Sequence, residues 1–206
     1  MTQMFEPVTK HIFRWGTNDA ETGIMMYSHL LINGDKAVLI DPVAMPGLAQ
    51  MIKVLAEPVA VIMTNYPHLR GSPILSRQLN VPLFIPDIET VDEDEKLVNT
   101  FLDLYSIRDA TKYNELTDLP LEIKGHAIPG RHEMALKYGY FLVVGDSAYS
   151  LNGKLTFYPT GIWPDEGGIK TGATAAALTP LIKKTSADGL LSGHVGDIVS
   201  GLQKML

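Results

Sequence analysis

Four segments of the sequence combine an apolar run with an abrupt change to glycine and polar residues. They are LLINGDKAVLIDPV (30–43), VIMTNYPHLRGS (61–72), YFLVVGDS (140–147) and LLSGHVGD (190–197). Short apolar runs bounded by turn signals are typical of buried strands. Stretches with helical spacing separate some of them, and this alternation indicates helices packed outside a sheet. In α/β architectures the loops after the carboxyl ends of strands carry the chemistry.

Local signals predict the individual elements. We expect strands at residues 10–15, 25–32, 37–40, 59–63, 81–85 and 189–192, and helices at 72–78, 90–106 and 172–184. Pro46 is expected to open a further helix, Thr179-Pro180 to break the helix at 172–184, and Asp197 to cap a final helix. We see no internal repeat or linker, so we predict a single domain over residues 1–206.

The composition excludes several classes of protein. The 206 residues can bury a substantial core, and 46% hydrophobic with 19% charged residues indicates a globular chain. A net charge of −6 argues against nucleic-acid binding, which needs a basic surface. No apolar run approaches the roughly 18 residues of a membrane span, the first residues lack a secretory signal, and there is no cysteine. We therefore expect a cytoplasmic protein without disulfides, nucleic-acid partners or membrane contact.

Two polar residues stand out because each follows an apolar strand. A carboxylate at the position of Asp146 must be paired, hydrogen-bonded or bound to a metal, because a bare buried charge is too costly. His194 has nearby glycines, which permit a close approach of the backbone to a ligand. His11 and His29 lie within alternating strands, and we interpret them as surface or hydrogen-bonded core histidines.

The order and spacing of the four segments resemble the metallo-β-lactamase superfamily, from about Tyr27 to the C-terminus. In this resemblance Asp41 matches the family's early buried aspartate, Asp146 the aspartate that usually bridges two metals, and His194 the last histidine ligand. The resemblance implies an α+β fold, namely an αββα four-layer sandwich. It also implies two metals at the sheet edges and hydrolysis of esters, thioesters, lactams or phosphodiesters.

The first metal loop departs from the family pattern T-H-x-H-x-D-H. Thr64 is kept, but the four ligand positions hold other residues, namely Asn65, Pro67, Leu69 and Arg70. His68 is displaced by one position, in a turn whose direction the sequence does not give.

A second loop also departs from the family. The third histidine normally follows a Pro-Gly pair, and here Pro129-Gly130 is followed by Arg131, with His132 one place later and His126 upstream. Zinc needs about three or four protein ligands. Asp146 and His194 would therefore need a third ligand from His68, His126 or His132.

We hypothesise that Arg70 replaces the positive charge of a metal and pairs bidentately with Asp146. A guanidinium is always protonated and cannot ligate a metal. The pocket of Asn65, His68, Arg70 and Arg131 would then bind a small anionic molecule, and binuclear zinc hydrolysis would be absent from this degenerate site. A simpler interpretation is that these polar groups only seal a vestigial cavity.

The alternative is a divergent hydrolase of esters, thioesters or phosphoesters. It would hold a single divalent metal (zinc, iron or manganese) at Asp146 and His194, and its catalytic residues would be Asp146, His194 and His68. Metal analysis separates the two interpretations. The sequence leaves open whether the protein is an enzyme, and it leaves open the oligomeric state, with a homodimer as one alternative.

Overall fold

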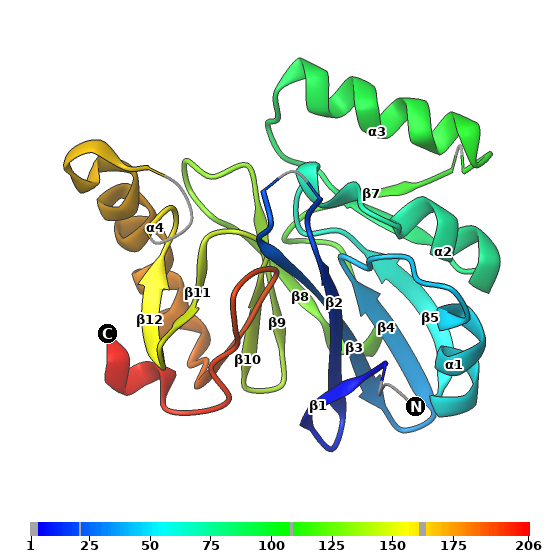
Figure 1. The fold of residues 1–206 in the computed structure, drawn as a ribbon, viewed down its shortest axis with the longest axis horizontal. Helices are drawn as coiled ribbons and strands as arrows, with labels where there is room; N and C mark the ends of the chain where they lie inside the picture. The colour runs from blue at the N-terminus through cyan, green and yellow to red at the C-terminus, as the bar shows by residue number, and fades with distance from the viewer. Residues whose placement is uncertain (1–3, 21, 108, 161–163) are drawn as a thin grey trace.

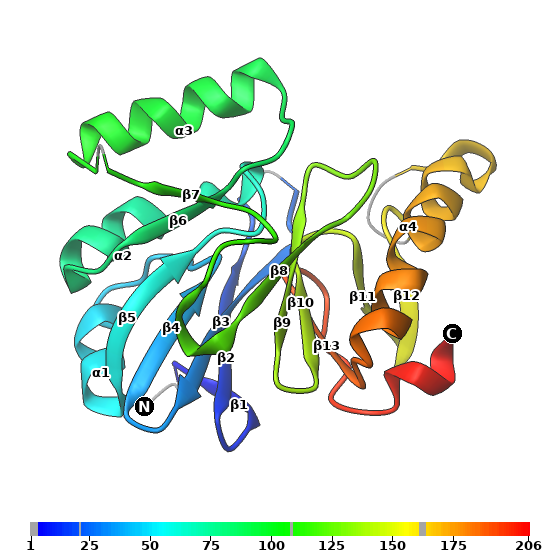
Figure 2. The same ribbon diagram turned by 180° about the vertical axis from the view of Figure 1, so that it is seen from behind.

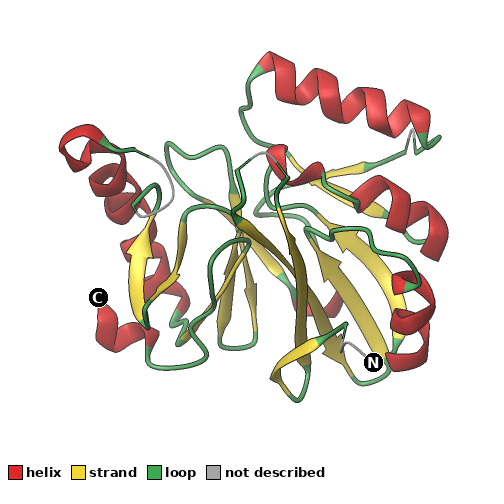
Figure 3. Cartoon of the chain, in the orientation of Figure 1, coloured by secondary structure: helices red, strands yellow, loops and turns green. Residues whose placement is uncertain are grey.

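The computed structural model describes residues 4–20, 22–107, 109–160 and 164–206. Two β-sheets lie between helices, as Figures 1 and 3 show. The strands of the first sheet lie side by side in chain order. They are β1 (Glu6–Thr9), β2 (Ile12–Asn18), β3 (Met25–Asn33), β4 (Lys36–Ile40), β5 (Glu57–Ile62), β6 (Leu83–Pro86) and β7 (Thr111–Tyr113). Pairing is antiparallel from β1 to β4 and parallel from β4 to β7.

The strands of the second sheet lie in the order β13, β10, β9, β8. Their bounds are β8 (Lys124–Ala127), β9 (Met134–Tyr138), β10 (Phe141–Val144) and β13 (Gly189–Ser192). Strand β10 pairs in parallel with β13 and antiparallel with β9. A separate antiparallel hairpin joins β11 (Ala148–Leu151) to β12 (Lys154–Phe157).

The helices lie on the two outer sides of the sheets. Helices α1 (Leu48–Leu55), α2 (Ser72–Leu79) and α3 (Asp92–Leu104) are on the side of the first sheet, and α4 (Ile169–Thr185) is beyond the second, which Figure 2 shows from behind. The short 3-10 helices are η1 (Pro67–Leu69), η2 (Pro120–Glu122), η3 (Glu166–Gly168) and η4 (Leu202–Met205). None of the helices in the described ranges is long and apolar enough to cross a membrane.

The alternation of side chains along the buried strands explains the layers. In β4, Val38 and Ile40 belong to the core between the sheets, whereas Leu39 belongs to the core under α1 and α2. In β10, Val143 faces the central core and Val144 faces the core under α4. Each apolar run thus serves two cores, because successive side chains on a strand point to opposite faces. The order helix, sheet, sheet, helix confirms the predicted αββα sandwich.

Two local predictions are wrong. Helix α4 continues through Pro180, because its buried residues Leu178, Leu181 and Ile182 hold both halves against the second sheet. The predicted final helix does not start at Asp197, since the described chain there forms only η4, farther along. The side chain of Asp197 is instead buried beneath the loop that carries His194.

Candidate functional site

The carboxyl ends of four strands bring the polar segments of the sequence together. Strand β4 leads to Asp41, and its parallel neighbour β5 leads to the loop that contains His68. In the second sheet β10 leads to Asp146, and its parallel neighbour β13 leads to His194. Parallel neighbours end at the same edge of a sheet. The two pairs of loops meet across the sandwich, where Nε2 of His68 lies 3.1 Å from Oδ1 of Asp146.

The loop after β5 turns His68 inward. Pro67 begins η1, and Oδ1 of Asn65 accepts a hydrogen bond of 2.8 Å from the backbone N–H of His68. His68 is only 3% exposed, and its Nδ1 lies 2.8 Å from Oδ2 of Asp41. Asp41 also accepts hydrogen bonds from the N–H (2.7 Å) and the hydroxyl (2.5 Å) of Thr64. The buried aspartate therefore anchors the displaced histidine.

Glu133 positions Asp146, although no motif in the sequence pointed to this buried glutamate. Glu133 is 2% exposed and accepts hydrogen bonds from the N–H groups of Gly145 (2.7 Å), Asp146 (3.1 Å) and Ser147 (3.1 Å). It also accepts one from the hydroxyl of Ser147 (2.8 Å). Burial and the nearby charge of Asp146 raise the pKa of Glu133 to about 7, although these hydrogen bonds lower it. A glutamate before an apolar strand is an ordinary surface signal, so no pattern in the sequence indicated this role.

His194 is held from both sheets. Its Nδ1 lies 3.1 Å from the carbonyl oxygen of Met25, and its N–H donates to the hydroxyl of Ser192 at 3.2 Å. Oδ1 of Asp197 accepts a hydrogen bond from the N–H of Ser192 (2.8 Å) and lies 3.2 Å from Nε2 of His29. Asp197 therefore fixes this loop instead of capping a helix. His29 is a hydrogen-bonded core histidine, which confirms the prediction for it.

Three side-chain atoms converge at the centre of the site. Oδ1 of Asp146 lies 3.1 Å from Nε2 of His68 and 3.0 Å from Nε2 of His194, and the two Nε2 atoms are 3.2 Å apart. Among the described residues, these three form the group of His, Asp and Glu side chains that could share one metal ion. Gly193 and Gly145 make room for the His68 ring. A Cβ at Gly193 would lie 2.6 Å from Cε1 of His68, and a Cβ at Gly145 would lie 3.0 Å from the same atom.

Hydrogen bonding fixes the tautomer of each imidazole. The carboxylate of Asp41 and the carbonyl of Met25 can only accept, so the Nδ1 atoms that face them carry the protons. In the neutral rings each Nε2 atom then carries a lone pair instead of a proton, and both Nε2 atoms face a third acceptor, Oδ1 of Asp146. Three acceptors this close repel one another unless a positive charge lies among them. A proton on an imidazole, the nearby guanidinium of Arg70 or a divalent metal ion can supply that charge.

The electrostatics of the cluster agree with this requirement. Burial and the charge of Arg70 lower the pKa of His68, but the carboxylates of Asp146 and Asp41 outweigh them and raise this pKa to about 9. Burial raises the pKa of Asp146, yet the charge of His68 and the hydrogen bonds from both imidazoles hold it well below its usual range. The protein thus favours two ionised carboxylates around a cationic centre.

Arg70 does not form the bidentate pair with Asp146 that we predicted. Its Nη1 donates to the carbonyl oxygens of Tyr27 (2.6 Å) and Asp41 (3.3 Å), and its Nη2 donates to the carbonyl oxygen of Gly193 (3.2 Å). Carbonyl groups at the strand ends therefore take up most of the guanidinium.

The acceptor positions of Asp146 are also filled by other groups. Nδ2 of Asn65 donates to Oδ2 of Asp146 at 2.8 Å, and within the described ranges the ion pairs of Asp146 are with His68 and His194. Arg70 reaches the cluster only through its Nη2, which lies 3.1 Å from Nε2 of His68 and 3.4 Å from Nε2 of His194. Its charge is thus close to the imidazole lone pairs and not paired with the carboxylate.

The cluster opens into a cavity of about 450 Å³, which we call the site cavity. Arg131 and Tyr158 line it together with His68, Asp146 and His194. The guanidinium carbon of Arg131 lies 4.4 Å from the centre of the Tyr158 ring.

The other candidate ligand histidines lie outside the cluster. His132 is exposed, and its Nδ1 lies 2.7 Å from the carbonyl oxygen of Glu89. His126 is half-buried on β8, where burial lowers its pKa. Of the three histidines that could have supplied a third ligand, the structure brings only His68 to Asp146 and His194.

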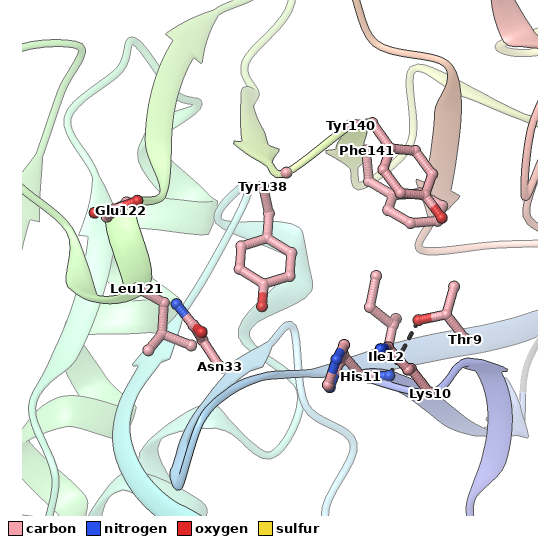
Figure 4. A pocket seen from close by; sticks show the side chains of 11 residues that line it. Thr9, Lys10, His11, Ile12, Asn33, Leu121, Glu122, Tyr138, Tyr140 and Phe141 are labelled. Atoms are coloured by element: carbon pink, nitrogen blue, oxygen red, sulfur yellow. Dashed lines mark hydrogen bonds between the residues drawn. The ribbon is translucent and has the colours of Figure 1, made fainter.

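A second cavity of about 400 Å³ lies elsewhere, lined by the β1–β2 turn, the end of β3, η2 and the β9–β10 turn (Figure 4). In Figure 4 the ring of Tyr138 points between Leu121 and His11, and its hydroxyl donates to the carbonyl oxygen of Ile32 at 2.7 Å. His11 lines this cavity as an exposed residue, as expected for a surface histidine. None of the three clustered residues lines it.

The fold is similar to that of solved metallo-β-lactamases over most of the chain. One is the enzyme from Pontibacter korlensis, with a TM-score of 0.66 and 14% identity over 98% of this chain and 94% of that chain. Another is FIM-1 from Pseudomonas aeruginosa in its mono-zinc form, with a TM-score of 0.63 and 13% identity over 96% and 88% of the two chains. ST1585 from Sulfolobus tokodaii, an archaeal member of the superfamily, has a TM-score of 0.61 and 16% identity over 92% and 82%.

No family model matches the sequence, and no curated protein matches it. At such low identities the structural likeness concerns the fold alone. The fold itself is clear: the chain has the metallo-β-lactamase fold, with a His-Asp-His group at the edge where its strands end.

Proposed function

We propose that the protein is a single-metal hydrolase of small anionic esters, thioesters or phosphoesters, with His68, Asp146 and His194 as the metal ligands. The observation that carries this proposal is the convergence of three acceptor atoms at 3.0 to 3.2 Å, with both imidazole tautomers fixed by their outer hydrogen bonds. Such an arrangement needs a cation at its centre.

The donor set fits a catalytic metal. Two imidazole nitrogens and one carboxylate oxygen suit zinc, iron(II) or manganese, and catalytic zinc sites typically have three protein ligands and one open position. When bound, such a metal supplies an activated water at neutral pH. Asp41 orients His68 through Nδ1, and Asn65 holds the second oxygen of Asp146. Outer partners of this kind usually tune ligand orientation and metal affinity.

A single ion is favoured over two. The loop positions that carry ligands in the family hold Asn65, Pro67, Leu69 and Arg70 here. The described part of the chain offers one group of three ligands, and a binuclear site needs more. FIM-1, of the same fold, exists in a mono-zinc form.

The test is metal analysis of protein purified without chelator, before and after addition of zinc, iron(II) or manganese. We expect about one equivalent in the native protein and its loss in His68→Ala, Asp146→Ala and His194→Ala. His126→Ala is the matched control, because that histidine lies outside the cluster. Hydrolysis of p-nitrophenyl esters and phosphoesters should follow the metal content. A native protein that binds none of these metals refutes the proposal.

One observation favours a second candidate, a metal-free anion-binding protein. Nη2 of Arg70 lies within 3.4 Å of both imidazole Nε2 atoms, so a guanidinium already stands where a positive charge is needed. Under this alternative, Arg70→Gln should weaken the binding of phosphate. Under the metal proposal the same change should instead strengthen zinc binding, because it removes a repelling cation.

A further inference from the structure

Arg131 places a positive charge at the site cavity, where no acceptor from the described ranges faces its guanidinium. No hydrogen bond or ion pair joins its guanidinium to another residue of the described ranges, and its Nε is buried and unpartnered. A buried donor without an acceptor is destabilising, and more so when the group is charged. A bound anion would satisfy this donor and the charge together.

Two features fix the guanidinium in place. Pro129 and Gly130 form a turn in which Gly130 has φ of 69° and the N–H of Arg131 donates to the carbonyl oxygen of Ile128 at 3.0 Å, the pattern of a type II turn. The ring of Tyr158 then supports the guanidinium at 4.4 Å. An arginine that is already ordered loses less conformational entropy when it binds a ligand.

We propose that Arg131, supported by Tyr158, is an anion subsite that holds a carboxylate or phosphate group of the substrate beside the His68–Asp146–His194 cluster. This rests on the proposed function for the role of the cluster, whereas anion binding itself does not need a metal. The planar guanidinium fork matches both oxyanions in a bidentate manner.

The other charges of the cavity do not compete for this role. Asp146 is occupied by two imidazoles and Asn65, Asp19 accepts hydrogen bonds from Thr22, and Arg70 is occupied by carbonyl oxygens. Arg131 is therefore the lining cation whose donors remain available within the described chain. A volume of about 450 Å³ suits a small organic anion.

The test measures the binding of inorganic phosphate and of benzoate to chelator-treated protein by NMR titration, so that no metal contributes to anion binding. Arg131→Gln should weaken the binding of at least one of the two anions about tenfold or more, the usual effect of losing charged hydrogen bonds. Arg131→Lys, which keeps the charge without the planar fork, should give an intermediate loss. Tyr158→Leu should cost about two- to fivefold, as expected for loss of a cation–π support, and Tyr158→Phe should cost little. Arg77→Gln is the matched control, because Arg77 is exposed and lies outside the site cavity.

The outcomes separate this proposal from the metal proposal. Unchanged binding of both anions in Arg131→Gln, or no binding of either anion to the native protein, overturns the subsite. Binding of benzoate alone identifies a carboxylate substrate, and binding of phosphate alone identifies a phosphate ester. Zinc content is measured in parallel: Arg131→Gln should keep its zinc. A native protein that lacks zinc but shows the Arg131-dependent anion binding would refute the hydrolase and retain the subsite.

Discussion

Zinc binding should release about one proton from His68 at neutral pH. The pKa of this imidazole is raised to about 9 because the carboxylates of Asp146 and Asp41 outweigh burial and the charge of Arg70, so at pH 7 the ring is protonated. A metal needs the neutral ring, and it must displace the proton from Nε2. Two pH units separate pH 7 from this pKa, at about 1.36 kcal/mol each. Proton competition should therefore weaken zinc binding at pH 7 by about 3 kcal/mol, or about 100-fold.

The assay is isothermal titration calorimetry of zinc in two buffers with different enthalpies of ionisation. The dependence of the measured heat on the buffer gives the number of protons released. The apparent affinity should rise about tenfold from pH 7 to pH 8, because the pKa lies above both. Asp41→Asn removes one of the two raising carboxylates and should reduce the rise. Stoichiometric zinc binding at pH 7 without proton release would contradict the electrostatic account of His68.

Three further outcomes follow from the same contacts. Gly193→Ala should lower the free energy of unfolding by about 1–3 kcal/mol and reduce zinc binding. The added Cβ would lie 2.6 Å from Cε1 of His68 and 2.7 Å from the carbonyl oxygen of Gly145. Urea denaturation measures the loss of stability, and an unchanged free energy of unfolding would contradict it. Glu133→Ala should lower stability by about 3 kcal/mol or more, since four buried or part-buried donor groups lose their acceptor, whereas loss of an exposed carboxylate such as Glu57 should change little. The lowered pKa values of Asp41 and Asp146 mean that their contribution to stability is present above the unfolded value of 3.8 and is lost as the pH falls through the lower folded values. Urea denaturation of the native protein and of Asp146→Asn from pH 7 to pH 3 tests this, and the difference between the two should shrink toward pH 3.

The alternation of apolar runs with helical segments predicted helices outside a sheet, whereas the four layers were implied by the family resemblance. Successive apolar residues in β4 and β10 face two different cores, so each run had to lie between a sheet and a helix layer. Asp197 was harder, because an aspartate after a strand is equally typical of a helix cap and of a buried ion pair. The choice between them depends on His29, which lies far away in the sequence.

The site could be predicted only in part, for a similar reason. Asp146 and His194 each follow an apolar strand, and the family resemblance implied that both belong to one metal site. The direction of His68 depends on a one-turn helix and on contact with Asp41, neither of which leaves a periodic signal. Arg70 was assigned to the wrong partner because its carbonyl acceptors belong to the backbone, whose free groups do not depend on residue type.

The displacement of the histidine by one position has a physical basis in this loop. The backbone of His68 departs from helical angles inside η1 (φ −84°, ψ 25°), and its side chain is buried. His68 faces Asp41, and the carboxylate fixes Nδ1 at 2.8 Å. Since the ring is planar, a fixed Nδ1 sends Nε2 toward Asp146 and His194 on the opposite side. The buried aspartate therefore decides which histidine enters the cluster, and a register comparison of the loop alone would count that ligand as missing.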